Sequence, residues 1–188
     1  MAKGGLIMPV IQHLDTALDI AKRKKEEMEF RTKRHNFLNS KEGVEKANAE
    51  FQLLVNSLKT KFADIKEVFP NFEIENKEMN SLIIKGNYLL LNVDWYNPIA
   101  DTLLEIDPYK KACLKVLIRK GKMSDRYNDM QNYINIYNKV YHYNLFYGNV
   151  YGWELEGVNK ANGIDGTDKY ETADELAETI LQSLVSNI

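Results

Sequence analysis

The chain has 188 residues, of which 44% are hydrophobic and 28% charged, a composition typical of a soluble globular domain rather than a disordered chain. Its net charge of −2 argues against a general nucleic-acid binder. No apolar stretch has the length of a membrane span, and residues 1–10 lack the basic and apolar regions of a signal peptide, so we predict no membrane association. The single cysteine, Cys113, can form no internal disulfide, which favours a cytoplasmic location.

Two long helices are predicted in residues 1–69. Pro9 suits the first turn of a helix that continues to about Phe37. Its apolar stripe is formed by Val10, Leu14, Ala17 or Leu18, and Ala21. Ser40 is a suitable N-cap for a second helix, which should end near Phe69 because a proline follows. The second stripe comprises Val44, Ala47, Phe51, Leu54, Val55, Leu58, Phe62 and Ile65. A short break between two long helices predicts an antiparallel helical hairpin.

Beyond Pro70 the hydrophobic period changes to two, which predicts strands. The dipeptides Gly86-Asn87 and Gly148-Asn149 each lie between two alternating segments, and both supply the positive φ that tight hairpin turns require. The flanking segments are Leu82–Lys85 and Tyr88–Val93 for the first dipeptide, and Val140–Tyr147 and Val150–Glu156 for the second. Residues 112–118 form a further strand candidate, and residues 102–106 a weaker one. We expect an antiparallel sheet of about six strands.

The remaining segments complete an α+β fold. Residues 124–139 are interpreted as a helix, since Met130, Ile134 and Tyr137 recur at helical steps, and residues 157–170 as a polar loop. Thr172 and Glu175 form a capping box that opens a terminal helix packed on the sheet. Its apolar face carries Leu176, Ile180, Leu181, Leu184 and Val185. Residues 70–188 would then form a sheet domain that folds as one cooperative unit with the helices of residues 1–69.

A tyrosine-rich segment surrounds the second Gly-Asn dipeptide. If Tyr147 pairs with Val150, one face of this hairpin carries an aromatic core, and the other carries tyrosines beside two carboxylates. Carboxylates resist burial without partners, so the second face is a candidate contact surface. Its members are Tyr141, Tyr143, Tyr147, Glu154 and Glu156. The alternative is that a helix covers these tyrosines, because aromatic stripes usually pack internally.

Two other clusters point to alternative functions. Asp94, Asp101 and Glu105 could hold a divalent cation in a metal-dependent nuclease or hydrolase, although their spacing is loose. Basic residues in the first helix could bind nucleic acid. They are Lys22, Arg23, Lys24, Lys25, Arg31 and Arg34. They do not gather on one face, and acids precede some basic residues by four positions, as Glu27 precedes Arg31, which is typical of an ordinary solvated helix.

No cofactor is predicted, because nucleotide-binding glycine motifs and zinc-ligand spacings do not occur. The leading hypothesis is therefore a non-catalytic protein-binding module that acts through a protein partner or as a homodimer. A small acidic protein with an aromatic surface could inhibit or mask a larger one. The metal-dependent nuclease and the nucleic-acid binder remain the alternatives.

Overall fold

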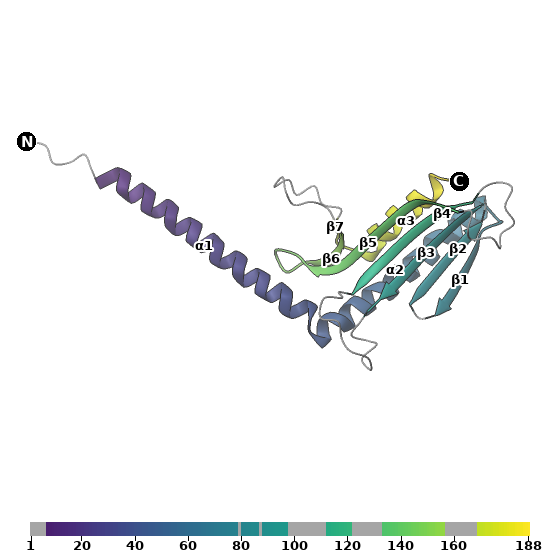
Figure 1. Ribbon diagram of the computed structural model, residues 1–188, viewed down its shortest axis with the longest axis horizontal. Helices are drawn as coiled ribbons and strands as arrows, with labels where there is room; N and C mark the ends of the chain where they lie inside the picture. The colour runs from purple at the N-terminus through teal and green to yellow at the C-terminus, as the bar shows by residue number, and fades with distance from the viewer. Residues whose placement is uncertain (1–6, 79, 87, 98–111, 122–132, 157–168) are drawn as a thin grey trace, which may run out of the picture.

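The computed structural model of the chain describes residues 7–78, 80–86, 88–97, 112–121, 133–156 and 169–188 (Figure 1). For residues 7–15, 38 and 76–78 it describes the backbone alone. The chain has three helices and seven strands among these residues. Their order and bounds are α1 (Ile7–Leu38), α2 (Lys41–Val68), β1 (Glu73–Glu78), β2 (Ser81–Gly86), β3 (Leu89–Tyr96), β4 (Cys113–Lys120), β5 (Ile134–Leu145), β6 (Tyr151–Leu155), β7 (Lys169–Tyr170) and α3 (Ala173–Val185).

The strands form a single seven-stranded antiparallel sheet in which the spatial order is the chain order, β1 to β7. Helices α2 and α3 both lie on one face of this sheet, beside one another (Figure 1). The predicted α+β class, with an N-terminal helical pair, an antiparallel sheet and a C-terminal helix, is confirmed. The part of the molecule made of the sheet, α2 and α3 is called the body below.

The core of the body lies between the sheet and these two helices. The apolar stripe of α2 is buried, as its spacing predicts, with Phe51, Leu54 and Leu58 fully inaccessible to solvent. Phe51 stacks on Trp95 of β3, with ring centroids 5.7 Å apart. Trp95 in turn meets Trp153 of β6 edge to face, with ring centroids 5.6 Å apart, so the aromatic core connects a helix with both halves of the sheet.

Helix α3 begins at the predicted capping box. The Thr172 side chain accepts a hydrogen bond from the Glu175 backbone N–H, and the Glu175 carboxylate accepts one from the Thr172 N–H. One turn of α3 is also tied to α2, because Asp174 accepts a hydrogen bond from the Ser57 hydroxyl and pairs with Lys61 at 3.1 Å. These contacts lower the pKa of the Asp174 carboxyl, the Ser57 hydrogen bond being the largest cause.

Helix α1 does not fold back along α2. It extends away from the body as a long arm, and among the described residues only its C-terminal turns contact the body (Figure 1). Every side chain from Thr16 to Glu29 is exposed. The side-by-side packing expected of an antiparallel hairpin is therefore not seen, although both helices are. The physical reason is that the sheet already buries the apolar stripe of α2, so no apolar face of α2 remains to receive α1.

The second Gly-Asn dipeptide lies in a wider turn than predicted. Gly148 and Asn149 both have positive φ, at 84° and 63°, as expected. However, the connection spans residues 146–150, and its ends are joined by a hydrogen bond from the Phe146 N–H to the Val150 carbonyl. Leu145, rather than Phe146, consequently pairs with Tyr151. The predicted register was wrong by one residue, and a one-residue shift moves every side chain of one strand to the opposite face.

Two other local predictions also differ from the structure. Ile134–Lys139 lies in strand β5, not in a helix, while residues 124–132 fall outside the described part of the chain. A bulge opposite Ile118 and Arg119 of β4 interrupts the alternation there, so a strand pattern was hidden. In the first hairpin Gly86 pairs with Leu89, and Tyr88 has a positive φ of 63°, while Asn87 lies outside the described residues. The weaker strand candidate at residues 102–106 lies outside the described residues.

Candidate interaction surfaces on the first helix and the tyrosine hairpin

The last turns of α1 dock against the hairpin formed by β5 and β6. Phe30 packs edge-on against Tyr147, with ring centroids 5.4 Å apart, and Phe37 packs on Tyr151 at 4.9 Å. The Lys33 ammonium donates a hydrogen bond to the Asn149 side chain at the tip of the hairpin. We call this set of contacts, together with the Arg34–Glu154 pair described next, the junction. It determines the direction in which the arm leaves the body.

The junction is centred on an ion pair between Arg34 and Glu154. Arg34 Nη2 lies 2.6 Å from Glu154 Oε2, and the two side chains are only 26% and 19% exposed. The same oxygen accepts a hydrogen bond from the buried Asn144 amide at 2.7 Å. Partial burial weakens the screening of this pair by water, so it contributes more than an exposed surface pair. Sequence reasoning missed it because 120 positions separate the two residues.

The observed pairing of β5 with β6 places the three tyrosines of the predicted surface in different environments. Tyr141 and Tyr143 are 1% and 5% exposed, and they belong to the core on the same side as Trp153. Their prediction as an exposed surface was therefore wrong, because Tyr143 pairs with Trp153 rather than lying beside Glu154. Tyr147 alone remains exposed, at 71%. The alternative, cover by a helix, agrees with the contact of Tyr143 with Glu50 of α2, whereas Tyr141 packs against Tyr170 of β7.

The buried Tyr143 has a polar partner on helix α2. Its hydroxyl hydrogen-bonds the Glu50 carboxylate of α2, and burial followed by the charge of Glu50 raises the pKa of the Tyr143 hydroxyl. Burial also raises the pKa of Glu50, against the opposing effect of Lys46. Lys46 itself lies over the Tyr151 ring, 3.4 Å from its centroid. These contacts join α2 to the strands that carry the junction.

Glu156 lies at the other end of the hairpin. Its carboxylate is 3.6 Å from His142 Nε2, while His142 Nδ1 is 3.1 Å from the Ala112 carbonyl oxygen. Burial, and then the nearby charge of Glu156, raises the pKa of the Cys113 thiol. Because the thiolate is the nucleophilic form, this shift lowers the reactivity of the Cys113 thiol.

The acidic cluster of the nuclease hypothesis is only partly described. Asp94 lies on β3, accepts a hydrogen bond from the Ser81 hydroxyl at 2.7 Å, and is the backbone register partner of Lys115 of β4. Asp101 and Glu105 lie outside the described residues. Among the residues that the structure does describe, no three His, Cys, Asp or Glu side chains are placed to hold a metal ion.

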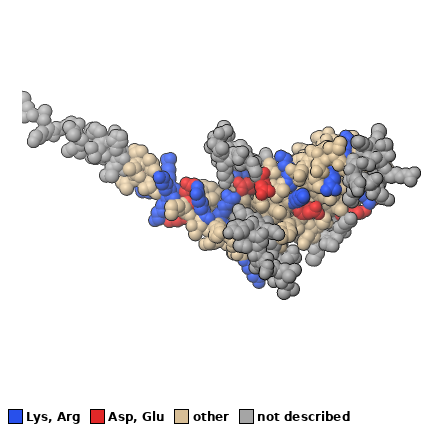
Figure 2. Space-filling view, viewed as in Figure 1, with Lys and Arg blue, Asp and Glu red and all other residues tan. Residues whose placement is uncertain are grey.

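The basic residues of the nucleic-acid hypothesis are spread along the exposed arm, with acidic side chains among them (Figure 2). Arg31 pairs with Glu27 at 2.6 Å, as the sequence spacing predicts, and Lys25 pairs with Glu29 at 3.8 Å. Arg34 is used in the junction. Lys22, Arg23 and Lys24 are exposed, and their binding of nucleic acid stays a prediction.

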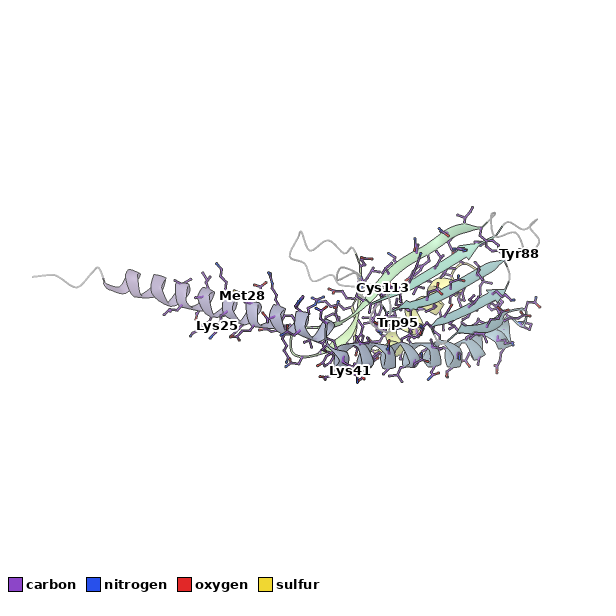
Figure 3. The ribbon with its side chains drawn as sticks, turned by 60° about the horizontal axis from the view of Figure 1, so that its bottom comes forward. Lys25, Met28, Lys41, Tyr88, Trp95 and Cys113 are labelled. Atoms are coloured by element: carbon purple, nitrogen blue, oxygen red, sulfur yellow. The ribbon has the colours of Figure 1, made fainter. Side chains whose placement is uncertain are left out.

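The arm also exposes apolar side chains. Leu18 and Ile20 are each 50% exposed and Met28 is 68% exposed. Figure 3 shows Lys25 and Met28 on the part of α1 that extends beyond the sheet, whereas Trp95 lies under the sheet within the body. A helix that packs against nothing gains little beyond its intrinsic propensity, and apolar side chains on it remain in contact with water.

A shallow groove of about 340 Å³ lies elsewhere, between α2 and α3, and contains none of the predicted site residues. Its lining comprises Lys61, Ile65, Glu178, Leu181, Gln182, Val185 and Ser186.

None of the helices in the described part of the chain combines the length and the apolar character that a membrane span requires. No protein-family model, curated protein or solved structure matches this chain.

Proposed function

We propose that the chain is a non-catalytic protein-binding protein whose binding element is the projecting helix α1. The observation that carries the proposal is the exposure of every side chain from Thr16 to Glu29, including Leu18 and Met28 on one face of the helix. Exposed apolar side chains on an otherwise unpacked helix are a feature of helix-mediated recognition, in which another chain covers the apolar face.

The junction supports this proposal because it holds the arm in one direction. Arg34–Glu154 and the ring contacts of Phe30 and Phe37 anchor the base of α1 to the hairpin. A pre-oriented binding helix loses less conformational entropy on association than a freely swinging one. In this proposal Tyr147 and Glu154 of the predicted surface act within the chain, where they position the arm, rather than by contacting a partner directly.

The proposal is tested by affinity capture with three forms of the full chain: wild type, the double variant Leu18→Asp/Met28→Asp, and the control Ile20→Asp. Leu18 and Ile20 have the same exposed fraction, but they lie two residues apart and so point about 160° away from each other around the helix. We expect a protein retained by wild type and by the control, identified by mass spectrometry, to be lost from the double variant.

Retention of the same proteins by all three forms would contradict the proposal, since it would show that the apolar face of the arm is not used. The aromatic core provides a folding control. Near-ultraviolet circular dichroism of Trp95 and Trp153 should be the same in all forms, because the substituted residues lie outside the body.

A further inference from the structure

Several apolar residues of α1 form a regular stripe on one face of the helix. Leu18, Ala21, Lys25 and Met28 are separated by alternating steps of three and four, and the same alternation continues toward the N-terminus through the sequence positions of Leu14, Ile11 and Ile7. This is the heptad spacing of a two-stranded coiled coil, with Lys25 as its single charged member. From Ile7 to Met28 the stripe is about 33 Å long.

The stripe faces away from the body. At 100° per residue, the junction residues Phe30, Lys33, Arg34 and Phe37 lie on one side of α1, and the stripe is centred about 145° from them. The junction therefore leaves the stripe pointing outward, and the body of the same molecule cannot cover it without losing the junction. Among the described residues, the stripe is therefore left open to a second molecule.

The charges on α1 favour a second copy in antiparallel orientation. In a parallel pair, Lys25 would face Lys25 of the second copy across the apolar seam, which places two like charges together. In an antiparallel pair with its two-fold axis between Asp19 and Ile20, Lys25 instead faces an apolar position, that of Leu14. Leu18 then faces Ala21, and Met28 faces the position of Ile11.

The flanking positions agree with this register. It brings the sequence position of Asp15 beside Lys22 of the second copy, and it does so twice because the interface is two-fold symmetric. Moving the register by one heptad toward the body would instead place Lys22 beside Lys22 and Lys24 beside Lys24. Charge complementarity thus selects one orientation and one alignment.

We propose that two copies of this chain associate through their α1 arms as an antiparallel two-stranded coiled coil centred between Asp19 and Ile20. This deepens the proposed function, on which it rests, by naming the partner as the chain itself. The two bodies lie at opposite ends of the paired arms, and their junctions remain on the outer sides.

The association is tested by sedimentation equilibrium and light scattering on the full chain at concentrations up to roughly 100 µM. Wild type and Ile20→Asp are expected to have the mass of a dimer, whereas Leu18→Asp/Met28→Asp is expected to be monomeric with unchanged near-ultraviolet circular dichroism. A monomeric wild type would overturn the inference, and so would a double variant that remains dimeric.

The orientation is tested by disulfide cross-linking in a Cys113→Ala background. In the proposed register Met28 is next to Ile11 of the second copy and about 25 Å from its Met28, far beyond disulfide reach. Mixing the Met28→Cys and Ile11→Cys proteins should therefore give a cross-linked dimer that neither protein forms alone. Cross-linking of Met28→Cys alone would show a parallel pair and overturn the antiparallel assignment.

Failure of the dimer and failure of the proposed function can be told apart. A monomeric wild type that still captures another protein through Leu18 and Met28 would overturn the homodimer and leave the protein-binding function standing. A monomeric wild type without such capture would overturn both.

Discussion

Helix α1 of the arm and helix α2 of the body have similar lengths, but α1 is surrounded by solvent and α2 is packed against the sheet. In α2, Phe51, Leu54 and Leu58 are fully buried against the sheet, whereas every side chain of α1 from Thr16 to Glu29 is exposed. Both helices carry an apolar stripe in the sequence. An apolar stripe alone therefore predicts a helix but not the surface that covers it.

The difference separates two uses of the hydrophobic effect. The stripe of α2 contributes to folding of the body, while the side chains of α1 from Thr16 to Glu29 stay in contact with water, which is why we propose a second chain as their partner. Between them, the junction couples the two regions through Arg34, Glu154 and the rings of Phe30 and Phe37. Substitutions in the buried core of the body, in the junction and at the exposed contact of Asp174 between α3 and α2 should therefore have effects of decreasing size on the free energy of unfolding.

The largest effect is expected for Phe51→Ala in the body. Phe51 is fully buried and stacks on Trp95, so truncation removes buried apolar surface and leaves a cavity. We expect the free energy of unfolding to fall by about 3–5 kcal/mol. Leu53→Ala on the same helix is the control, because Leu53 is 55% exposed and should lower it by less than about 1 kcal/mol. Denaturant titration followed by tryptophan fluorescence measures both, and equal losses would refute the assignment of the core.

A smaller effect is expected for Arg34→Ala in the junction. This change removes a partly buried ion pair and should lower the free energy of unfolding by about 1 kcal/mol, with faster hydrogen exchange in the last turns of α1. Arg31→Ala is the matched control, since Arg31 makes an exposed pair with Glu27 within the same helix. Its effect should be about 0.3 kcal/mol. If the two variants exchange equally fast at residues 30–37, the junction does not hold the arm.

The smallest effect is expected at Asp174, which joins α3 to α2. Its pKa is lowered in the folded protein from 3.8, so its contribution is fully present above pH 3.8 and is lost as the pH falls through the lower folded value. Asp174→Asn should therefore make the free energy of unfolding slightly less dependent on pH in this acid range. Above pH 3.8 the slope of the free energy of unfolding against pH should change little. Urea titrations of wild type and variant across pH 2.5 to 5 measure the difference. A variant with the full wild-type acid dependence would show that other carboxylates account for it.

Much of the fold could be predicted because its signals are local. The period of Phe51, Leu54 and Leu58 predicts helix α2, and Thr172 with Glu175 predicts the start of α3, since both patterns depend on residues within one or two turns. The candidate surface was harder to predict. Its membership depends on strand register, and a five-residue turn in place of a two-residue turn moved Tyr143 into the core beside Trp153.

The sequence by itself determined the class of the protein, the two long N-terminal helices, the antiparallel hairpins and the terminal helix, because helix and strand periods are properties of neighbouring residues. Only the tertiary structure decided that α2 takes the sheet face while α1 projects from the body, and that Arg34 meets Glu154. These outcomes depend on which apolar surfaces compete for the same partner and on contacts between residues more than 100 positions apart, neither of which local spacing records.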